Sequence, residues 1–172
     1  STIVVGAGAT WHDIQSAIHP RFAVKSMQST HIFSVGGSIS VHAHGMDHQA
    51  GALMDSVRAL RIMLPDGRIV IASREVEPEL FAHVVGGYGL FGIILAAELE
   101  VVPNHVYASE RALIRYDEFP GRFARIAADP GIGLMYAHLS TAPGSLLEEA
   151  LVYTYRRVDD EGAERPPLGE VS

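Results

Sequence analysis

Two glycine-rich segments constrain this chain more than any other feature of its sequence. The first runs from Phe33 to Gly45 (FSVGGSISVHAHG) and the second from Val85 to Ile94 (VGGYGLFGII). In the first, a Gly-Gly pair follows a short apolar run and precedes hydroxyl residues. Glycine lets a backbone approach a diphosphate closely and donate N–H groups to it, whereas a side chain at Gly36 or Gly37 would stand in between. This segment therefore predicts a diphosphate-binding backbone.

The composition is that of a folded protein without thiol chemistry. The 172 residues are 48% hydrophobic and 19% charged, and no stretch has the roughly 20 uninterrupted apolar residues of a membrane helix. There is no cysteine, which excludes disulfides and thiol nucleophiles and fits a reducing cytoplasm, the location we expect. The net charge of −7 with scattered basic residues argues against a nucleic-acid partner. The length allows one domain and part of a second.

Hydrophobic periodicity and turn residues predict a mixed fold of helices and antiparallel strands. Strands are expected at 3–5, 33–35, 56–64, 68–72 and 93–102, with a hairpin turn at Pro65-Asp66-Gly67 and helices at 11–18 and 78–85. A helical turn is expected at 38–43. The pattern changes after Asn104, where strands at 108–116, 133–140 and 151–157 and a helix at 119–127 are expected. We place a domain boundary there, giving domains of residues 1–103 and 104–172.

Two stretches resemble the dinucleotide-binding string G-x-G-x-x-G without its structural context. Gly6-Ala-Gly8-Ala-Thr-Trp11 has tryptophan in place of the third glycine, and no acidic residue follows at the usual distance. We interpret it as an ordinary strand-to-helix turn. The second stretch, at 87–92, matches letter for letter but follows a predicted helix and precedes a predicted strand, the reverse of the required order. Its glycines are expected to let the backbone run beside something flat.

Taken together, five segments resemble the flavin-binding domain of the vanillyl-alcohol-oxidase family, also called the para-cresol-methylhydroxylase type. The matching segments cover most of residues 3–102 and are VGAGATWHDI at 5–14, FSVGGSISVHAHG at 33–45, DSVRALRIMLPDG at 55–67, PELF at 78–81 and GGYGLFGII at 86–94. Within the family, His44-Gly45-x-x-His48 is most similar to sugar and polyol oxidases, including decaprenylphosphoryl-ribose oxidase.

The resemblance implies an α+β fold: the second subdomain of a flavin domain, mostly antiparallel sheet with flanking helices, followed by the start of an α/β cap domain. It implies FAD as cofactor and an oxidoreductase that transfers a hydride from an alcohol-bearing sugar, polyol or hydroxy acid to the flavin. The first subdomain and its phosphate loop have no counterpart here. We therefore expect a fragment that binds FAD poorly alone and whose exposed faces favour a homo-oligomer.

The same resemblance implies a set of cofactor-binding residues, whereas the catalytic residues stay unknown. Lining of the pyrophosphate is implied for Ser34, Val35, Gly36 and Gly37, and approach to the ribityl chain or flavin ring for Val41, His44 and Gly45. Ile94 is implied to meet the cofactor through its backbone. A donor such as His44 beside the ring could stabilise the anionic reduced flavin.

Two other interpretations remain open at this stage. The spacing of His42, His44 and His48 suggests a zinc site, but Gly45 interrupts the segment and no cysteine is available, so we predict no metal. The chain could also be a non-catalytic binding or interaction module that keeps the flavoprotein fold, because fold does not determine function. Bound flavin in the purified protein would distinguish the enzyme from such a module.

Overall fold

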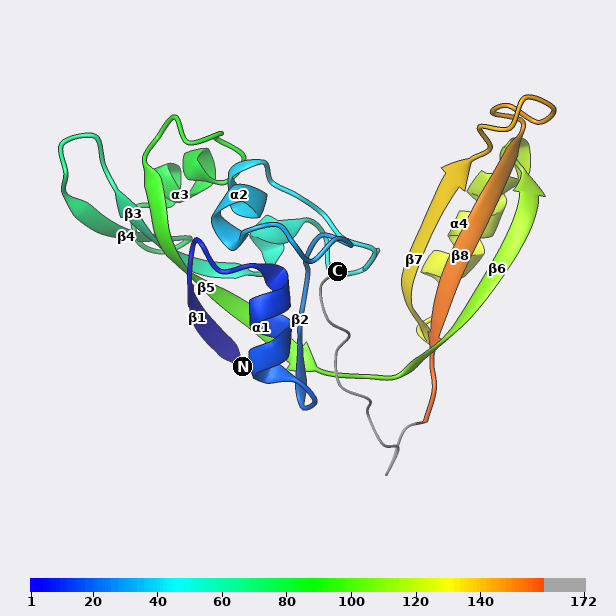
Figure 1. The fold of residues 1–172 in the computed structure, drawn as a ribbon, viewed down its shortest axis with the longest axis horizontal. Coiled ribbons are helices and arrows are strands. Elements are labelled where there is room, and N and C mark those ends of the chain that lie inside the picture. Colours follow the sequence, from blue (N-terminus) through cyan, green and yellow to red (C-terminus); the bar gives the residue numbers. More distant parts are fainter. Residues whose placement is uncertain (160–172) are drawn as a thin grey trace. The chain divides into compact units, whose positions relative to one another are not determined.

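The computed structural model describes residues 1–159 and divides them into two compact units (Figure 1). The first unit contains residues 1–45 and 50–104, and the second contains residues 46–49 and the described residues from 105 onward. The assignment of residues 104–172 to a cap domain stays a prediction. Its part after Asp159 lies outside the described residues.

The first unit is an antiparallel sheet with helices on one face. Its elements are β1 (Thr2–Gly6), α1 (Trp11–Ile18), β2 (Phe22–Val24), α2 (Val35–Ser40), the 3-10 helix η1 (Leu53–Asp55), β3 (Val57–Met63), β4 (Ile69–Ser73), α3 (Pro78–Val84) and β5 (Ile93–Pro103). The strand order is β1-β5-β3-β4, and β2 also pairs with β5. The long strand β5 therefore pairs with three other strands. The α+β fold class is confirmed.

The core of this unit lies between the sheet and the three helices. Trp11 and Phe81 are its largest fully buried side chains, on α1 and α3. They pack with inward-facing strand residues such as Leu60 and Leu99. Alternate residues of each strand point to the opposite face, and that face of the sheet carries exposed side chains, Val4 and Ile71 among them.

Most of the predicted elements of this unit are confirmed. The helix α1 begins at a capping box: the side chain of Thr10 accepts from the Asp13 amide, and the Asp13 carboxylate accepts from the Thr10 amide. The hairpin of β3 and β4 turns at residues 65–67, and α3 starts with a proline in its first turn. The three-residue strand β2 was not predicted, because so short a segment has no periodicity of its own.

The structure corrects the prediction around the Gly-Gly pair. A strand at 33–35 followed by a helical turn at 38–43 was expected, whereas α2 spans Val35–Ser40 and contains both glycines. Ser34 is its N-cap and accepts a hydrogen bond from the Gly37 amide. Only Ser34 keeps a strand-like contact, an isolated bridge to Thr10. The Ser34 cap and the hydrogen bonds of Val35 and Gly36 to the β1–α1 turn support the helix despite the low helix propensity of glycine.

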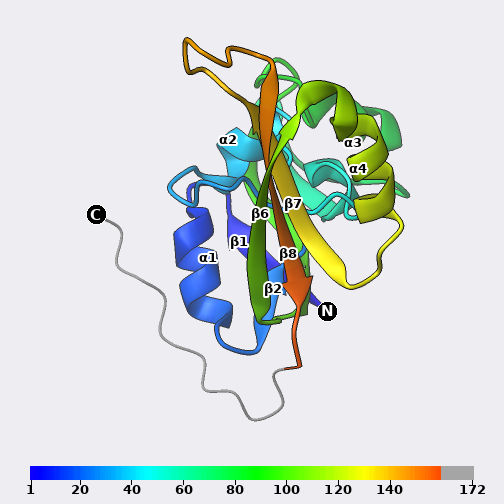
Figure 2. The same cartoon turned by 90° about the vertical axis from the view of Figure 1, so that its right-hand side faces the viewer.

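The second unit is a three-stranded antiparallel sheet with one helix (Figure 2). Its elements are β6 (Tyr107–Arg115), the 3-10 helix η2 (Tyr116–Glu118), α4 (Phe119–Ala127), β7 (Ile132–Leu139) and β8 (Glu149–Arg157), with the strand order β6-β8-β7. The predicted helix and the three predicted strands are confirmed. Its small core contains Ile126 of α4, Met135 of β7 and Val152 of β8. Across residues 1–159, no helix is long and apolar enough to cross a membrane.

Candidate functional site

The two glycine-rich segments meet at the C-terminal end of α2. The Gly86 amide donates to the Ile39 carbonyl, and the Tyr88 amide donates to the Ser40 carbonyl, both at 3.0 Å. These bonds satisfy carbonyls that a helix end leaves without partners. Gly86 has a φ of 77° and Tyr88 a φ of 51°, so the loop turns sharply to reach them. The sequence singled out both segments but gave no sign of this contact.

The N-terminal end of α2 packs against the turn that joins β1 to α1. The Val35 amide donates to the Ala9 carbonyl at 2.9 Å, and the Gly36 amide donates to the Ala7 carbonyl at 2.8 Å. In turn, the Ala7 amide donates to Leu95 of β5 at 3.0 Å. The helix is therefore fixed at both ends by backbone hydrogen bonds to the rest of the unit.

This packing engages the amides of Val35 and Gly36 within the protein, and their predicted lining of the pyrophosphate stays a prediction. Both residues are buried, and both amides are already bonded to protein carbonyls. A Cβ on Gly36 would lie 2.9 Å from the Ala7 Cβ, a separation that real side chains do not tolerate. Gly36 is therefore needed for the contact between α2 and the turn.

The opposite side of α2 is accessible and carries the remaining predicted residues. Gly37, Val41 and His44 are exposed and Ser34 is partly exposed, at a spacing that places 34, 37 and 41 on one side of a helix. A Cβ on Gly37 would meet only the Ser34 Oγ, at 3.0 Å. Its amide donates to the same oxygen at a long 3.3 Å. We call Ser34, Gly37, Val41 and His44 the outer face of α2.

The last two predicted cofactor residues lie deeper. Gly45 is partly buried, and a side chain there would collide with the Met27 carbonyl, so the protein's own backbone explains this glycine. Ile94 is partly buried against the core at the start of β5 and pairs with Ile62. It lies next to Leu95, which holds the β1–α1 turn. Their predicted contact with the cofactor stays a prediction.

A buried polar network on the core-facing side of α2 orients this helix. The Trp11 indole N–H donates to the Ser38 Oγ at 2.9 Å, and this hydroxyl also lies within hydrogen-bond distance of Gln28 Oε1 and the Ser34 carbonyl. Trp11 and Ser38 are almost fully buried. Because a buried polar group without a partner is costly, the network favours one rotation of the helix, and that rotation turns the outer face outward.

The glycines of the second segment mostly serve internal packing, which corrects the expectation that they accompany something flat. Side chains at Gly87 and Gly92 would collide with the His83 carbonyl and with the Ile62 side chain. Gly89 alone adopts a positive φ, 79°, with open space around it. The side chains of Tyr88 and Leu90, which flank it, are largely exposed.

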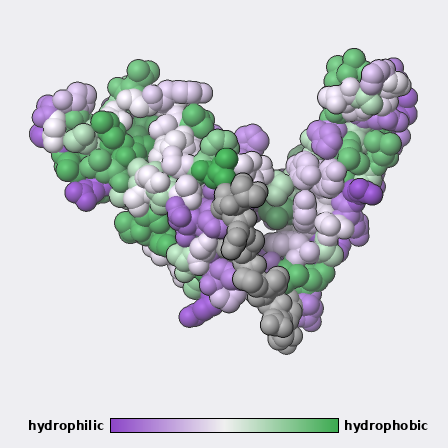
Figure 3. Space-filling view, viewed as in Figure 1, coloured by the Kyte–Doolittle hydropathy of each residue, from purple (hydrophilic) through white to green (hydrophobic). Residues whose placement is uncertain are grey.

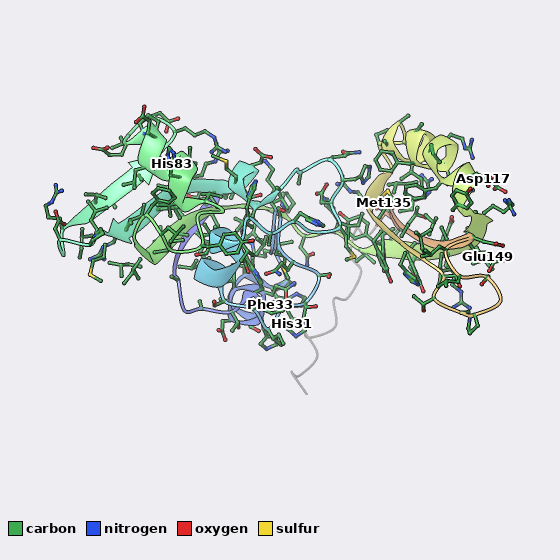
Figure 4. The ribbon with its side chains drawn as sticks, turned by 90° about the horizontal axis from the view of Figure 1, so that it is seen from above. His31, Phe33, His83, Asp117, Met135 and Glu149 are labelled. Atoms are coloured by element: carbon green, nitrogen blue, oxygen red, sulfur yellow. The ribbon has the colours of Figure 1, made fainter. Side chains whose placement is uncertain are left out.

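The residues before α2 bring further groups to this part of the unit. Figure 4 shows His31 and Phe33 close together on the segment that leads into the helix. The His31 carbonyl accepts from the His12 amide, and the two imidazole rings lie 5.2 Å apart. In the described part of the chain, the amides of Gly8 and Ser34 have no hydrogen-bond partner. Sequence reasoning missed Gly8, although a Gly-x-Gly turn between a strand and a helix is a signal for such an exposed amide.

The histidines do not form a metal site. No group of three or more His, Cys, Asp or Glu side chains within residues 1–159 is placed to hold a metal ion. His42 and His44 are exposed. Both ring nitrogens of His48 are buried without a hydrogen-bond partner among the described residues.

Two carboxylates of the first unit, Asp13 and Glu100, act as structural anchors. Hydrogen bonds from the Thr10 amide and hydroxyl lower the pKa of Asp13 and keep the capping carboxylate ionised. Burial raises the pKa of Glu100 on β5, but the hydrogen bonds and charges of Lys25 and Arg58 outweigh it, so the net shift is downward. Neither carboxylate is held protonated as a general acid would need to be.

The second unit carries an aromatic cluster on the sheet face opposite α4. The Tyr136 and Tyr153 rings stack in parallel with centroids 4.5 Å apart, and Tyr155 and His138 lie beside them. Burial and the neighbouring Tyr153 and Tyr155 raise the pKa of Tyr136, which favours its protonated, hydrogen-bond-donating form. The cross-strand neighbour of Tyr153 on β6 is Arg111. Figure 4 shows Met135, Asp117 and Glu149 in the same unit.

Comparison with known proteins identifies the cofactor class. Residues 1–73 match a family model described as FAD binding domain. The chain is 32% identical over 103 residues to decaprenylphosphoryl-beta-D-ribose oxidase of Mycolicibacterium smegmatis, covering 58% of this chain and 22% of that protein. It is 28% identical over 116 residues to D-arabinono-1,4-lactone oxidase of Yarrowia lipolytica, with coverages of 67% and 22%.

A further relative is cytokinin dehydrogenase 4 of Arabidopsis thaliana, 29% identical over 150 residues, or 81% of this chain and 28% of that protein. The chain thus spans between a fifth and a third of the length of these relatives. The matched region contains β1, α1, α2, β3 and β4, and with them the outer face of α2. Residues 1–73 are thus similar to FAD binding domains, and this match indicates FAD as the cofactor.

Proposed function

We propose that this chain forms one wall of the flavin site of an FAD-dependent oxidoreductase and that the outer face of α2 is the surface that meets the cofactor. The observation that carries the proposal is the contrast within the Gly-Gly pair. Gly36 is buried against Ala7, whereas Gly37 is exposed and has only the Ser34 Oγ near the position of a side chain. A glycine on an accessible face, whose side-chain position meets only one hydroxyl and no backbone, fits close approach by a ligand.

The donors of this face suit a nucleotide with a diphosphate. The Ser34 amide has no hydrogen-bond partner among the described residues, and the Gly37 amide has only a long bond, 3.3 Å, to the Ser34 hydroxyl. At the other end of the face, Val41 offers an apolar contact and His44 an imidazole. Ser34 and Gly37 would hold phosphate oxygens, Val41 would contact the polyol chain or ring, and the His44 imidazole would donate a hydrogen bond beside the ring.

When bound, FAD would supply the acceptor for a hydride from the carbon that carries the substrate's hydroxyl group. The chain's own part would be to position the cofactor, to keep water from one side of it, and to stabilise negative charge with the His44 N–H. The fixed ends of α2 support this role, because a preorganised donor loses little free energy on binding.

For the substrate, we propose a small molecule with an alcohol group, such as a sugar, polyol or hydroxy acid. The relatives' names refer to a sugar lactone, a lipid-linked ribose and a cytokinin. The tyrosine hydroxyls and the imidazole of the cluster on β7 and β8 are groups that hydrogen-bond well to such hydroxyls. For a partner beyond small molecules, we propose a second copy of the chain.

The glycine pair provides a matched test in the complete protein. Gly37→Ala should leave the unfolding midpoint unchanged or slightly raised, because alanine favours a helix. It should also weaken FAD binding about tenfold or more, equivalent to about 1.4 kcal/mol. Gly36→Ala should instead lower the unfolding midpoint. FAD binding is followed by quenching of flavin fluorescence on titration.

Two results would count against the proposal. If Gly37→Ala binds FAD as tightly as the unmodified protein, the outer face of α2 does not meet the cofactor. If the complete protein is colourless when purified and does not bind added FAD, the non-catalytic binding module becomes the better interpretation.

A further inference from the structure

The first unit leaves the face of its sheet opposite the helices accessible. Because strand residues alternate, this outer sheet face is made of one residue in two from four neighbouring strands. It carries Val4 of β1, Ala96 and Ile93 of β5, Ala59 and Met63 of β3, and Ile69 and Ile71 of β4. Figure 3 shows green, apolar surface over the part of the unit that contains β1 and the β3–β4 hairpin.

The large side chains of this face are unusually exposed for apolar residues in a sheet. Val4 is 72% exposed, Ile93 58% and Ile71 52%. Single exposed apolar residues are normal, but a contiguous group over four strands indicates a surface that another molecule covers. The opposite sheet face shows the contrast, since Leu60, Ile62 and Leu99 there are buried under the helices.

Charged residues interrupt this apolar face, among them Arg61, Glu98 and Glu100. Arg61 lies on β3 between Ala96 and Ile71, and Glu98 lies on β5 between Val4 and Ala59. They are therefore diagonal neighbours of opposite charge on one face. Within residues 1–159 neither makes a salt bridge, whereas Glu100, one alternation further along β5, is paired with both Lys25 and Arg58. An unpaired cation and an unpaired anion on one apolar face are complementary to the same face of another copy.

We propose that the outer sheet face is the interface of a two-fold dimer in which Arg61 of each copy pairs with Glu98 of the other. The two-fold axis would lie parallel to the sheet, midway between Arg61 and Glu98 and perpendicular to the line that joins them. Rotation about this axis places Arg61 of each copy opposite Glu98 of the other. Each copy then contributes the same surface, as in an isologous interface. Two stacked sheets lie about 10 Å apart, so the apolar side chains fill the space between them.

A second copy fits the observations better than a different partner would. A partner with a surface of one charge sign would place a like charge opposite either Arg61 or Glu98. A purely apolar partner would bury both side chains without a partner of opposite charge. The same face turned by two-fold symmetry satisfies both charges and covers the apolar residues. The interface lies on the sheet face opposite α2, so it is independent of the proposed cofactor surface.

Charge exchange between Arg61 and Glu98 tests this arrangement. Sedimentation equilibrium of the full chain should show a monomer–dimer equilibrium for the unmodified protein. Arg61→Glu and Glu98→Arg should each weaken the dimer about tenfold or more, because each places two pairs of like charges together. An equimolar mixture of the two variants should restore the dimer as a heterodimer, since every contact is then between opposite charges. Circular dichroism of each variant verifies that it is folded.

An apolar pair of variants gives a second readout. Ile71→Lys on the face should also weaken the dimer. Leu90→Lys, at a still more exposed apolar residue on the loop after α3, should not. A chain that stays monomeric at every concentration overturns the proposal and indicates another occupant for the face. A dimer that survives Ile71→Lys, or a mixture of the charge variants that stays monomeric, overturns it too. FAD binding by the complete protein should be unchanged in Arg61→Glu. A failure of the dimer proposal can therefore be distinguished from a failure of the proposed FAD-binding surface.

Discussion

The two units of this chain differ most in how much apolar side chain each one buries. The first unit gathers fifteen buried residues in one cluster that includes Trp11 and Phe81, whereas the cluster of the second contains Ile126, Ile132, Met135 and Val152. Hydrophobic stabilisation grows with the apolar area removed from water. We therefore expect the first unit to hold its backbone firmly and the second to be marginal by itself.

This difference matches what each unit is proposed to do. The outer face of α2 works through backbone groups at fixed positions, which require a rigid support on both helix ends. The second unit instead offers side-chain hydroxyls and an imidazole on an open sheet face, and such groups tolerate adjustment. The contrast can be measured, because Trp11 is the only tryptophan and reports on the first unit, while near-ultraviolet circular dichroism of the stacked tyrosines reports on the second.

The largest expected effect is the removal of Phe81 from the larger core. Phe81→Ala should lower the free energy of unfolding of the first unit by about 3–5 kcal/mol, because it leaves a cavity at a site that is 1% exposed. Urea unfolding followed by Trp11 fluorescence measures the change. The tyrosine signal of the second unit should be unaffected. Val76→Ala, at an exposed site, is the control, and equal effects of the two substitutions would contradict the burial.

Ile126→Ala should lower the free energy of unfolding of the second unit by nearly as much as Phe81→Ala lowers that of the first. Because the second unit has the smaller core, this loss should unfold it. The substitution removes about 2–5 kcal/mol from a core of four buried residues, enough to unfold the second unit while Trp11 fluorescence still reports a folded first unit. The matched control is Leu113→Ala on β6, which is 62% exposed. Simultaneous loss of both signals would mean that the two units unfold as one and that the contrast drawn here is false.

The capping box of α1 gives a smaller effect, confined to the first unit. Thr10→Ala should cost about 1 kcal/mol, because it removes the side-chain acceptor for the Asp13 amide. The urea midpoint of the first unit, followed by Trp11 fluorescence, should fall. The midpoint of the second unit, followed by tyrosine circular dichroism, should not change. Thr141→Ala, at a position outside any helix or strand, is a control for the loss of a threonine. No shift in Thr10→Ala would show that the cap does not stabilise the helix.

The smallest effect should be a pH dependence of the second unit. A hydrogen bond from Arg156, with help from the Gly131 amide, lowers the pKa of Asp129. A depressed carboxyl pKa stabilises the folded state fully above the ordinary value of about 3.9, and this stabilisation is lost as pH falls below it. In Asp129→Asn, the stability of the second unit, followed by tyrosine circular dichroism, should therefore fall less as the pH is lowered. The stability of the first unit, followed by Trp11 fluorescence, should have the same pH dependence as in the unmodified protein. A pH dependence of the second unit identical to that of the unmodified protein would show that the ion pair does not stabilise the unit.

The sequence was sufficient where local pattern determines structure. Alternation predicted β3, β4, β5 and the three strands of the second unit, and Thr10 with Asp13 marked the start of α1. It failed at 33–40, where Gly-Gly suggested a turn. There the helix is fixed by hydrogen bonds from Val35 and Gly36 to residues of the β1–α1 turn, which are distant in sequence and leave no local signal.

The candidate site was predictable in composition but not in orientation. Sequence resemblance selected the segment that we propose meets the cofactor, yet it could not separate Gly37, which is exposed, from Gly36, which is buried against Ala7. That distinction depends on the rotation of α2, which Trp11 and Ser38 control from 27 residues apart. Neither Tyr88 nor Gly8 could be assigned to this neighbourhood, because their positions follow from loops that meet α2 only in the folded chain.

The position of β5 has a consequence for how the protein is made. This strand pairs with β1, β2 and β3, but it is the last strand of its unit to leave the ribosome. Until it emerges, β1 and β2 lack the strand that pairs with them, and both edges of the β3–β4 hairpin are unpaired. Long-range pairing of this kind is slow and leaves strand edges exposed. During translation the helix that carries the proposed cofactor surface should therefore reach its final place only after residue 103 has been added.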